Sequence, residues 1–137
     1  MSCYIIAEVG PNHNGDLAIA RDIIARLAGT GVDAVKFQLA VPENVYSRDA
    51  FKADYQTEFD GAGSPLEMSR RIQLSQSEHE VLYEDCRAAG LDYLCTAFDL
   101  ESLKFLDRNF DLKYFKVASG EIVSLDTLRY IAERDRP

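Results

Sequence analysis

Short apolar runs alternate with amphipathic helical patterns along this chain of 137 residues, and this alternation constrains the fold more than any other feature. The runs are rich in β-branched and aromatic residues, which is typical of buried strands. Each run is followed by apolar residues at three- and four-residue spacing, which indicates a helix. Repeated strand–helix units predict a parallel sheet with helical crossovers. The predicted strands are residues 5–9, 33–38, 92–98 and 113–119.

The predicted helices begin at residues that cap helices well. Asp16 and Asp99 can each accept hydrogen bonds from the first turn of the helix that follows. Ser75 and Glu78 have the spacing of a capping box, in which each side chain bonds the backbone of the other residue. Ser124 opens the last predicted helix. Each strand is therefore followed by a helix with its own start signal.

Four strand–helix units fit two architectures, a small doubly wound sheet and a piece of a (β/α)8 barrel. Eight barrel units take about 250 residues, so four units need about 125. The length of 137 residues favours half of a barrel over a whole one. We therefore predict an α/β fold of the (β/α)8 TIM-barrel type, with residues 1–137 forming its first four units.

Residues 41–74 interrupt the repeat and show no sustained period. Connections of this length in a compact domain are usually functional or disordered. This one leaves the C-terminal end of the second predicted strand, which is where parallel strand–helix folds place their active sites. We expect residues 41–74 to form a long loop on the active face.

Charge and cysteine content limit the partners and the environment of the chain. Lys and Arg number 15 against 23 Asp and Glu, a net charge of −8, which argues against nucleic acid or an anionic membrane as the main partner. No apolar run approaches the ~20 residues of a membrane helix, and the N-terminus lacks a signal-peptide pattern. Three cysteines without CxxC spacing predict neither a disulfide framework nor a zinc site. We expect a cytoplasmic protein that binds small molecules.

Four charged residues lie at or just beyond predicted strands that are otherwise apolar, namely Glu8, Lys36, Lys116 and Glu121. A parallel strand is covered on both faces, so an ionised group within it needs a counter-charge or a place at the strand end that faces a ligand. Glu8 could pair with Lys36 as a purely structural bridge, and the lysines could extend to the surface. Recurrence at equivalent positions of consecutive strands favours a shared site instead.

Polar residues accompany these charges, namely Gln38, Thr96 and Ser119 with Gly120. Together with two lysines they predict a pocket for a small dianion, such as a phosphate ester that also carries a carboxylate. Carboxylates beside such a pocket suit a hydroxylated or carbonyl-bearing second substrate. His13 reaches the same rim, where it could touch the ligand or shape the turn.

The remaining histidine and the strand cysteine receive plainer interpretations. His79 falls on a predicted helix, and we expect a polar surface residue there. Cys95 has no histidine partner in view, so we expect a small core residue rather than a nucleophile. Neither histidine lies at metal-ligand spacing from other ligands, so we predict no metal site from these residues.

Several segments follow one another in an order that identifies a family. They are residues 5–10, 12–15, 34–38, 53–56, 96–99 and 116–121. This series resembles the sialic acid synthase family, whose members include N-acetylneuraminate, legionaminate and pseudaminate synthases, and the segments at 34–38 and 53–56 are closer to the first two. One departure is Ala97, since the family usually has proline there.

The resemblance implies a TIM-barrel enzyme that condenses phosphoenolpyruvate with an N-acetylated hexosamine, such as N-acetylmannosamine, to a nine-carbon 2-keto acid and phosphate. Carboxylates would face the sugar, with a proton-transfer role for one of them, and lysines would stabilise charge on the departing phosphate. By resemblance, the residues that hold phosphoenolpyruvate are Lys36, Gln38, Thr96, Lys116, Ser119 and Gly120. Those that face the sugar are Glu8, Glu121 and His13, and the catalytic group is Glu121 with Lys36 and Lys116.

The resemblance also implies parts beyond four units. These are a second half-barrel with two histidine ligands for a Mn²⁺ or Mg²⁺ ion, a C-terminal antifreeze-like domain, and a homodimer. We expect residues 1–137 to lack these parts, to self-associate or need a complementary half, and not to catalyse the condensation alone. Two other functions stay open: another phosphoenolpyruvate-condensing synthase of 3-deoxy sugar acids, and a non-catalytic domain that binds an anion or a partner.

Overall fold

Three parallel strands form the sheet in the computed structural model, which describes residues 3–46 and 63–137. The strands are β1 (Ile6–Glu8), β2 (Ala34–Leu39) and β3 (Asp92–Ala97), hydrogen-bonded in the order β1-β2-β3. Helix α1 (Leu17–Leu27) connects β1 to β2, and α5 (Gln76–Ala88) precedes β3. The predicted α/β class with a parallel sheet and helical crossovers is confirmed.

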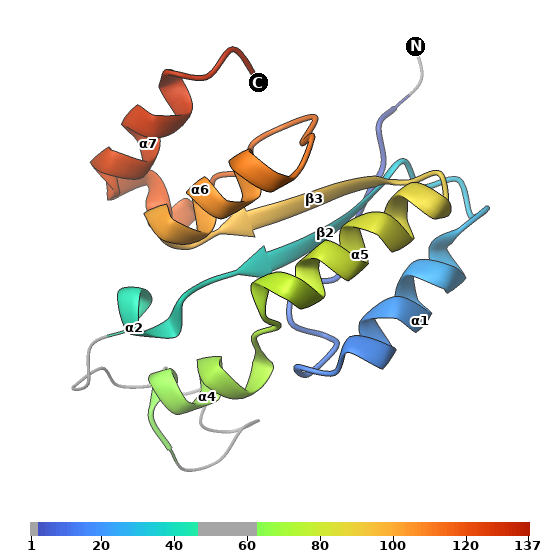
Figure 1. Cartoon of the computed structure of the whole chain (residues 1–137), viewed down its shortest axis with the longest axis horizontal. Coiled ribbons are helices and arrows are strands. Elements are labelled where there is room, and N and C mark those ends of the chain that lie inside the picture. Colours follow the sequence, from blue (N-terminus) through green and yellow to red (C-terminus); the bar gives the residue numbers. More distant parts are fainter. Residues whose placement is uncertain (1–2, 47–62) are drawn as a thin grey trace.

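The other elements lie around this sheet. They are α2 (Pro42–Val45), α4 (Pro65–Ile72), α6 (Leu100–Asn109), the 3₁₀ helix η1 (Ser119–Val123) and α7 (Leu125–Ala132). Figure 1 shows α1 next to α5 and α6 next to α7, while α2 and α4 lie beyond the C-terminal end of β2. No helix within the described ranges is both long and apolar enough to cross a membrane.

The strand register places the polar strand residues on one face of the sheet. Lys36 is opposite Glu8 on β1, and Gln38 is opposite Thr96 on β3. Side chains alternate along a strand, and residues in register on parallel neighbours point to the same side. Glu8, Lys36, Gln38 and Thr96 therefore share one face, near the C-terminal ends of their strands.

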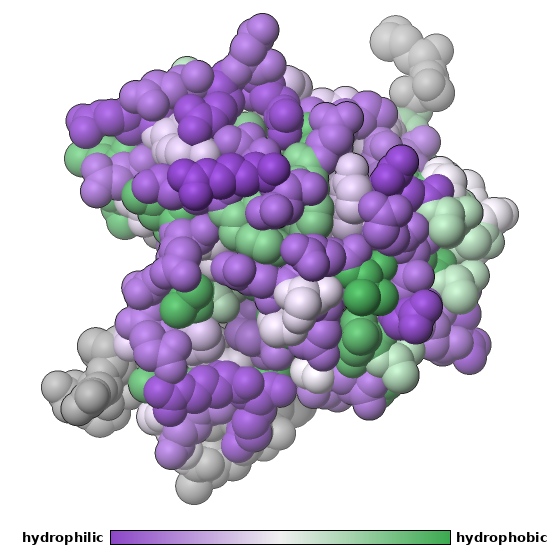
Figure 2. All heavy atoms as spheres, in the orientation of Figure 1, coloured by the Kyte–Doolittle hydropathy of each residue, from purple (hydrophilic) through white to green (hydrophobic). Residues whose placement is uncertain are grey.

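The other face of the sheet forms the hydrophobic core. Phe37 on β2 and Tyr93 on β3 are buried there, and their stacked rings have centroids 5.9 Å apart. Three helices cover this layer with Ile24 from α1, Leu82 from α5 and Leu106 from α6. Burial of each such side chain stabilises the fold by about 1.5–3 kcal/mol. Figure 2 shows mostly hydrophilic side chains on the surface that it presents.

The predicted helix starts are confirmed at three positions. The Asp16 carboxylate accepts hydrogen bonds from two backbone N–H groups at the start of α1, and Asp99 accepts one from Ser102 in α6. Ser75 and Glu78 form the reciprocal capping box of α5. Ser124 precedes α7 as predicted, but its side chain makes no capping hydrogen bond.

Residues 113–119 do not form the predicted fourth strand. Their link to the sheet is an isolated parallel bridge between Lys116 and Thr96, and η1 begins at Ser119. On the other side of the segment, the Phe115 N–H donates one hydrogen bond of 2.8 Å to the Pro137 carbonyl. Within residues 3–46 and 63–137, this segment therefore lacks the continuous ladder of backbone hydrogen bonds that holds a parallel strand in a sheet.

The prediction that residues 41–74 lack regular structure is wrong for the part that the structure describes, because this part contains α2 and α4. Helix α4 begins with a second capping box between Ser64 and Glu67, with Pro65 in the first turn. This Ser-Pro-Leu-Glu sequence is itself a helix-start signal. Residues 47–62, including the 53–56 motif, lie outside the described residues.

The expectation that His79 is a surface residue is wrong. The side chain is fully buried, and its Nδ1 forms a 2.6 Å hydrogen bond with the Tyr93 hydroxyl. Positions 79, 82 and 86 are separated by three and four residues, so His79 shares the buried face of α5 with Leu82 and Cys86. Burial lowers the pKa of His79 from 6.5 to about 4.

This burial predicts a loss of stability in mild acid. The unfolded chain takes up the His79 proton near pH 6.5 and the folded chain only near pH 4, so the stabilisation is complete above pH 6.5 and is lost as the pH falls toward 4. We expect the unfolding free energy to fall by about 3 kcal/mol from this group. The His79→Gln variant lacks this titrating group. Its unfolding free energy, measured by urea unfolding at pH 7 and pH 4, should therefore fall less between the two pH values than that of the wild-type chain. Equal falls in the variant and the wild type would contradict the prediction.

Candidate functional site

A nearly buried lysine at the C-terminal end of the sheet forms the centre of the candidate site. The Lys36 side chain on β2 is 11% exposed. Its ammonium forms an ion pair with Glu8 on β1 and donates a 3.3 Å hydrogen bond to the Thr96 hydroxyl on β3. The Glu8 carboxylate is 48% exposed, so the pair opens to solvent on the Glu8 side. Three strands therefore contribute one polar group each to a single position.

Gln38 joins this group through Gly10. A Cβ atom placed on Gly10 would lie 3.2 Å from Gln38 Nε2 and 3.3 Å from Glu8 Oε1, so both side chains reach the Gly10 backbone. Gly10 has φ +52°, a conformation that side chains disfavour, and its N–H donates to the Lys36 carbonyl over 3.2 Å. The turn after β1 thus holds Glu8 and Gln38 close to Lys36.

His13 shapes this turn and is not part of the Lys36 cluster. Its Nδ1 accepts a 3.1 Å hydrogen bond from the Gly15 N–H, and the residue is buried. Its ring is next to Phe37, with centroids 6.2 Å apart, on the core side of the sheet. Burial lowers the pKa of His13. His13 could touch a ligand or shape the turn after β1, and the structure favours the role in the turn.

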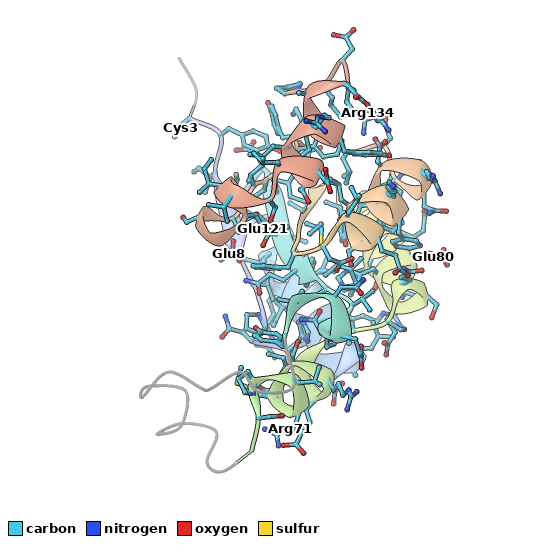
Figure 3. All side chains as sticks on the ribbon, turned by 90° about the vertical axis from the view of Figure 1, so that its left-hand side faces the viewer. Cys3, Glu8, Arg71, Glu80, Glu121 and Arg134 are labelled. Atoms are coloured by element: carbon cyan, nitrogen blue, oxygen red, sulfur yellow. The ribbon has the colours of Figure 1, made fainter. Side chains whose placement is uncertain are left out.

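The predicted residues after position 113 lie apart from the Lys36 cluster. Lys116 is beside Thr96 through the backbone bridge, but its ammonium donates a 2.7 Å hydrogen bond to the Val117 carbonyl. Ser119 and Gly120 are exposed on η1. Figure 3 looks onto this end of the sheet, and Glu121 and Glu8 lie near each other in that projection. No ion pair or hydrogen bond joins Glu121 to the described residues of the cluster.

Glu121 instead lines a pocket of about 420 Å³ beside the C-terminal end of β3. Its wall is formed by α2, the first residues of α6, η1 and the start of α7. The lining residues are Asn44, Val45, Phe98, Asp99, Leu100, Glu101, Glu121, Ser124 and Thr127. The turns after β2, β3 and the 113–118 segment therefore meet at one hollow.

Asp99 holds two of these turns together, a role that the sequence analysis missed. Beyond the capping bond, its Oδ2 accepts a 2.6 Å hydrogen bond from the Ser102 hydroxyl and a 2.8 Å bond from the Val41 N–H. The residue is buried. A helix-capping aspartate was evident in the sequence, but a second donor 58 positions away carries no local signal.

The sequence pattern of the NeuB family matches residues 23–137. The chain belongs to this family. The N,N'-diacetyllegionaminic acid synthase of Legionella pneumophila is 35% identical over 138 residues, which are 100% of this chain and 38% of that protein. The synthase of the same name from Campylobacter jejuni is 40% identical over 133 residues, which are 96% of this chain and 40% of that protein. The chain thus spans 38–40% of the length of these relatives.

Solved structures show the same relationship. The N-acetylneuraminic acid synthetase from Leptospira borgpetersenii matches 97% of this chain and 42% of its own with a TM-score of 0.74 and 25% identity. The spore coat polysaccharide biosynthesis protein SpsE from Bacillus subtilis matches 98% of this chain and 34% of its own with a TM-score of 0.71 and 30% identity. The resemblance to the sialic acid synthase family is confirmed.

Two further expectations for this NeuB-family chain concern cysteine and metal. Cys95 is buried, and burial raises the pKa of its thiol to about 12, which confirms a core residue rather than a nucleophile. No three His, Cys, Asp or Glu side chains are grouped to hold a metal ion in residues 3–46 and 63–137. These residues do not fit the Mn²⁺ or Mg²⁺ ion that the resemblance implies.

The contact between Gly10 and two site residues predicts the effect of a small substitution. Gly10→Ala should cost about 1–2 kcal/mol of stability through its positive φ, and its new methyl group should displace Gln38 and Glu8. Gly29→Ala is a matched control, because Gly29 has φ +75° and open space around it. A crystal structure of Gly10→Ala should show the Gln38 and Glu8 side chains moved away from position 10, whereas Gly29→Ala should leave both in place. Unmoved side chains in Gly10→Ala would contradict this geometry.

Proposed function

We propose that this chain carries the phosphoenolpyruvate-binding part of a synthase that condenses phosphoenolpyruvate with an N-acetylated hexosamine to a nine-carbon 2-keto sugar acid and phosphate. The observation that carries the proposal is the nearly buried Lys36 ammonium between Glu8 and Thr96, at the C-terminal end of a parallel sheet. Membership of the NeuB family supports it, as do the synthase names of the relatives.

The Lys36 cluster has the chemistry that a phosphate ester needs. A dianion that reaches Lys36 replaces the Glu8 carboxylate, and the Thr96 hydroxyl and the Gln38 amide can donate further hydrogen bonds. Lys116 turns from the Val117 carbonyl toward the same ligand, since its backbone is already beside Thr96. The two ammonium groups then stabilise charge as the phosphate departs.

Carboxylates serve the second substrate in this proposal. Glu8, once released from Lys36, accepts hydrogen bonds from sugar hydroxyl groups. Glu121 is half-buried in the wall of the 420 Å³ pocket, and it is the proposed proton-transfer group near the sugar carbonyl. Ser119 and Gly120 precede it in η1 on the phosphoenolpyruvate side.

We also propose that the strand–helix units of this chain are the N-terminal part of a closed (β/α)8 barrel, which forms a homodimer as a complete enzyme. The relatives contain more than twice the length that this chain covers. Three aliphatic side chains at η1 and α7 are open to solvent, with exposed fractions of 66% for Ile122, 77% for Val123 and 69% for Leu125. Further strand–helix units would bury these three side chains, since exposed aliphatic side chains close together in the sequence are typical of an interaction surface.

The exposed aliphatic residues predict self-association of the 137-residue chain. Sedimentation velocity should show a weight-average mass that rises with concentration, because the aliphatic patch is removed from water on contact. The double variant Ile122→Ser, Leu125→Ser should reduce this rise, whereas Ile19→Ser on α1 should not. A wild-type chain that stays monomeric at high concentration would contradict the prediction.

The central role of Lys36 predicts a large loss of ligand affinity on its removal. Lys36→Met should weaken phosphoenolpyruvate binding about 10- to 100-fold, the equivalent of one charge-assisted hydrogen bond of 1.5–3 kcal/mol. Lys116→Met should weaken it as well. Lys113→Met is the control, since Lys113 pairs with Asp92 at the opposite end of the sheet. Isothermal titration calorimetry measures the phosphoenolpyruvate affinity of the wild-type chain and of the three variants. Unchanged affinity in both Lys36→Met and Lys116→Met would overturn the site.

A further inference from the structure

Helix α4 ends against the turn that leads from β1 into α1 (Figure 1). A Cβ atom placed on Gly15 would collide with the carbonyl oxygen of Arg71 and would lie 3.2 Å from its carbonyl carbon. Both atoms belong to the backbone, so no change of side-chain rotamer can make room for a side chain at position 15. Gly15 also has φ +75°, a conformation that favours glycine. The glycine therefore allows α4 to approach this turn closely.

Hydrogen bonds make the turn at residues 10–15 a firm connection. The Asn12 N–H donates to the Val9 carbonyl over 3.1 Å, and the Asp16 N–H donates to the His13 carbonyl over 2.9 Å. The Gly15 N–H donates to Nδ1 of His13, whose side chain is buried. Closely packed parts of a protein transmit a displacement instead of absorbing it. A shift of the turn at position 15 is therefore passed on to its other end.

The other end of the turn is in contact with the candidate site. Glu8 and Gln38 both reach Gly10, and the Gly10 N–H donates to the Lys36 carbonyl over 3.2 Å. A shift of Gly10 therefore changes the positions of Glu8 and Gln38 relative to the Lys36 ammonium. In this way the Gly15 contact with α4 is linked to the geometry of the site.

A second contact of α4 fixes the end of β2. Gln73 is the C-cap residue of α4, and its Oε1 accepts a 3.2 Å hydrogen bond from the Ala40 N–H. Ala40 follows β2 directly and lies two residues beyond Gln38. The next N–H along the chain, that of Val41, donates to Asp99 at the start of α6 over 2.8 Å. Side chains from α4 and α6 thus hold consecutive backbone groups where β2 ends.

A third contact of α4 is weaker. Arg70 on α4 and Glu43 on α2 form an ion pair of 2.6 Å, but both side chains are about half exposed. Exposed ion pairs contribute little to stability, because water screens them and both side chains lose freedom. The contacts at Gly15 and Gln73 therefore determine where the end of α4 lies.

We propose that Gly15 and Gln73 are positioning residues for phosphoenolpyruvate binding. They hold the end of α4 against the β1 turn and the end of β2, and this arrangement keeps Gln38 and Glu8 in place beside Lys36. The inference rests on the proposed synthase function and adds two residues that act through the backbone and not by contact with the ligand. It also explains why the 12–15 segment ends in glycine.

Matched glycine variants separate positioning from a general loss of stability. Gly15→Ala should weaken phosphoenolpyruvate binding about tenfold, because misplaced binding groups lose affinity steeply. Gly29→Ala should leave the affinity unchanged. Both substitutions place a side chain at φ +75°, but Gly29 has open space around it. Isothermal titration calorimetry measures both affinities, and thermal melts verify that both variants are folded.

Gln73 offers a second, independent pair of variants. Gln73→Met removes the acceptor of the Ala40 N–H and should weaken phosphoenolpyruvate binding several-fold. Gln73→Glu keeps an acceptor oxygen and should retain the wild-type affinity. If Gly15→Ala does not fold, this pair decides the question, and equal affinities of the two Gln73 variants would then reject the inference.

Amide hydrogen exchange, followed by NMR on the ¹⁵N-labelled chain, gives a readout that does not need the ligand. The Ala40 N–H should exchange about tenfold faster in Gly15→Ala and in Gln73→Met, because its acceptor is displaced or removed. The Val41 N–H is the internal control, since Asp99 holds it and it should stay protected.

Two results would overturn the inference. One is equal phosphoenolpyruvate affinity of folded Gly15→Ala and Gly29→Ala. The other is an equal loss of protection at Ala40 and Val41, which would indicate that the whole segment loosens. A wild-type chain that binds no phosphoenolpyruvate rejects the synthase proposal instead, and exchange at Ala40 then tests the contacts of α4 by itself.

Discussion

The ion pair between Lys36 and Glu8, together with the Thr96 hydrogen bond, is the interaction on which the candidate site depends. A lysine with 11% of its side chain exposed has lost most of its hydration, so its charge needs partners. Both partners come from the neighbouring strands. The parallel register places Glu8 opposite Lys36, and it places Thr96 opposite Gln38, which lies two positions along β2 on the same face as Lys36. A partly exposed carboxylate can be exchanged for a ligand anion at modest cost, so in the proposed function the same contact serves as a structural pair and as a binding site.

Much of this arrangement could be predicted from the sequence. Alternating apolar residues fix the core face of β2, so Lys36 and Gln38 had to share the opposite face. Capping residues Asp16, Ser75 and Asp99 mark the starts of their helices because the capping hydrogen bond is made to the first turn of the same helix. The resemblance of the motifs to sialic acid synthases agreed with the NeuB-family match. These features depend on neighbours within a few residues or on strand alternation.

The parts that could not be predicted depend on distant contacts. His79 is a polar residue on a buried helix face, and only the Tyr93 hydroxyl explains why it is tolerated there. Residues 113–119 have strand composition, but a strand also needs a continuous hydrogen-bonded ladder with a neighbour, and this segment makes only an isolated bridge between Lys116 and Thr96. Thr127 and Asn44 are unremarkable in the sequence, since the pocket that joins them is formed by turns more than 80 positions apart. The start of α4 is different, because its capping box of Ser64 and Glu67 is a local signal that the sequence carries.

A crystal structure of the chain with phosphoenolpyruvate is the most direct test of the Lys36 site. We expect phosphate oxygens within hydrogen-bond distance of Lys36 Nζ and Thr96 Oγ1, with the Glu8 carboxylate turned away from the lysine and Lys116 turned toward the ligand. A phosphate bound elsewhere, with the Lys36–Glu8 pair intact, would contradict the proposed binding site.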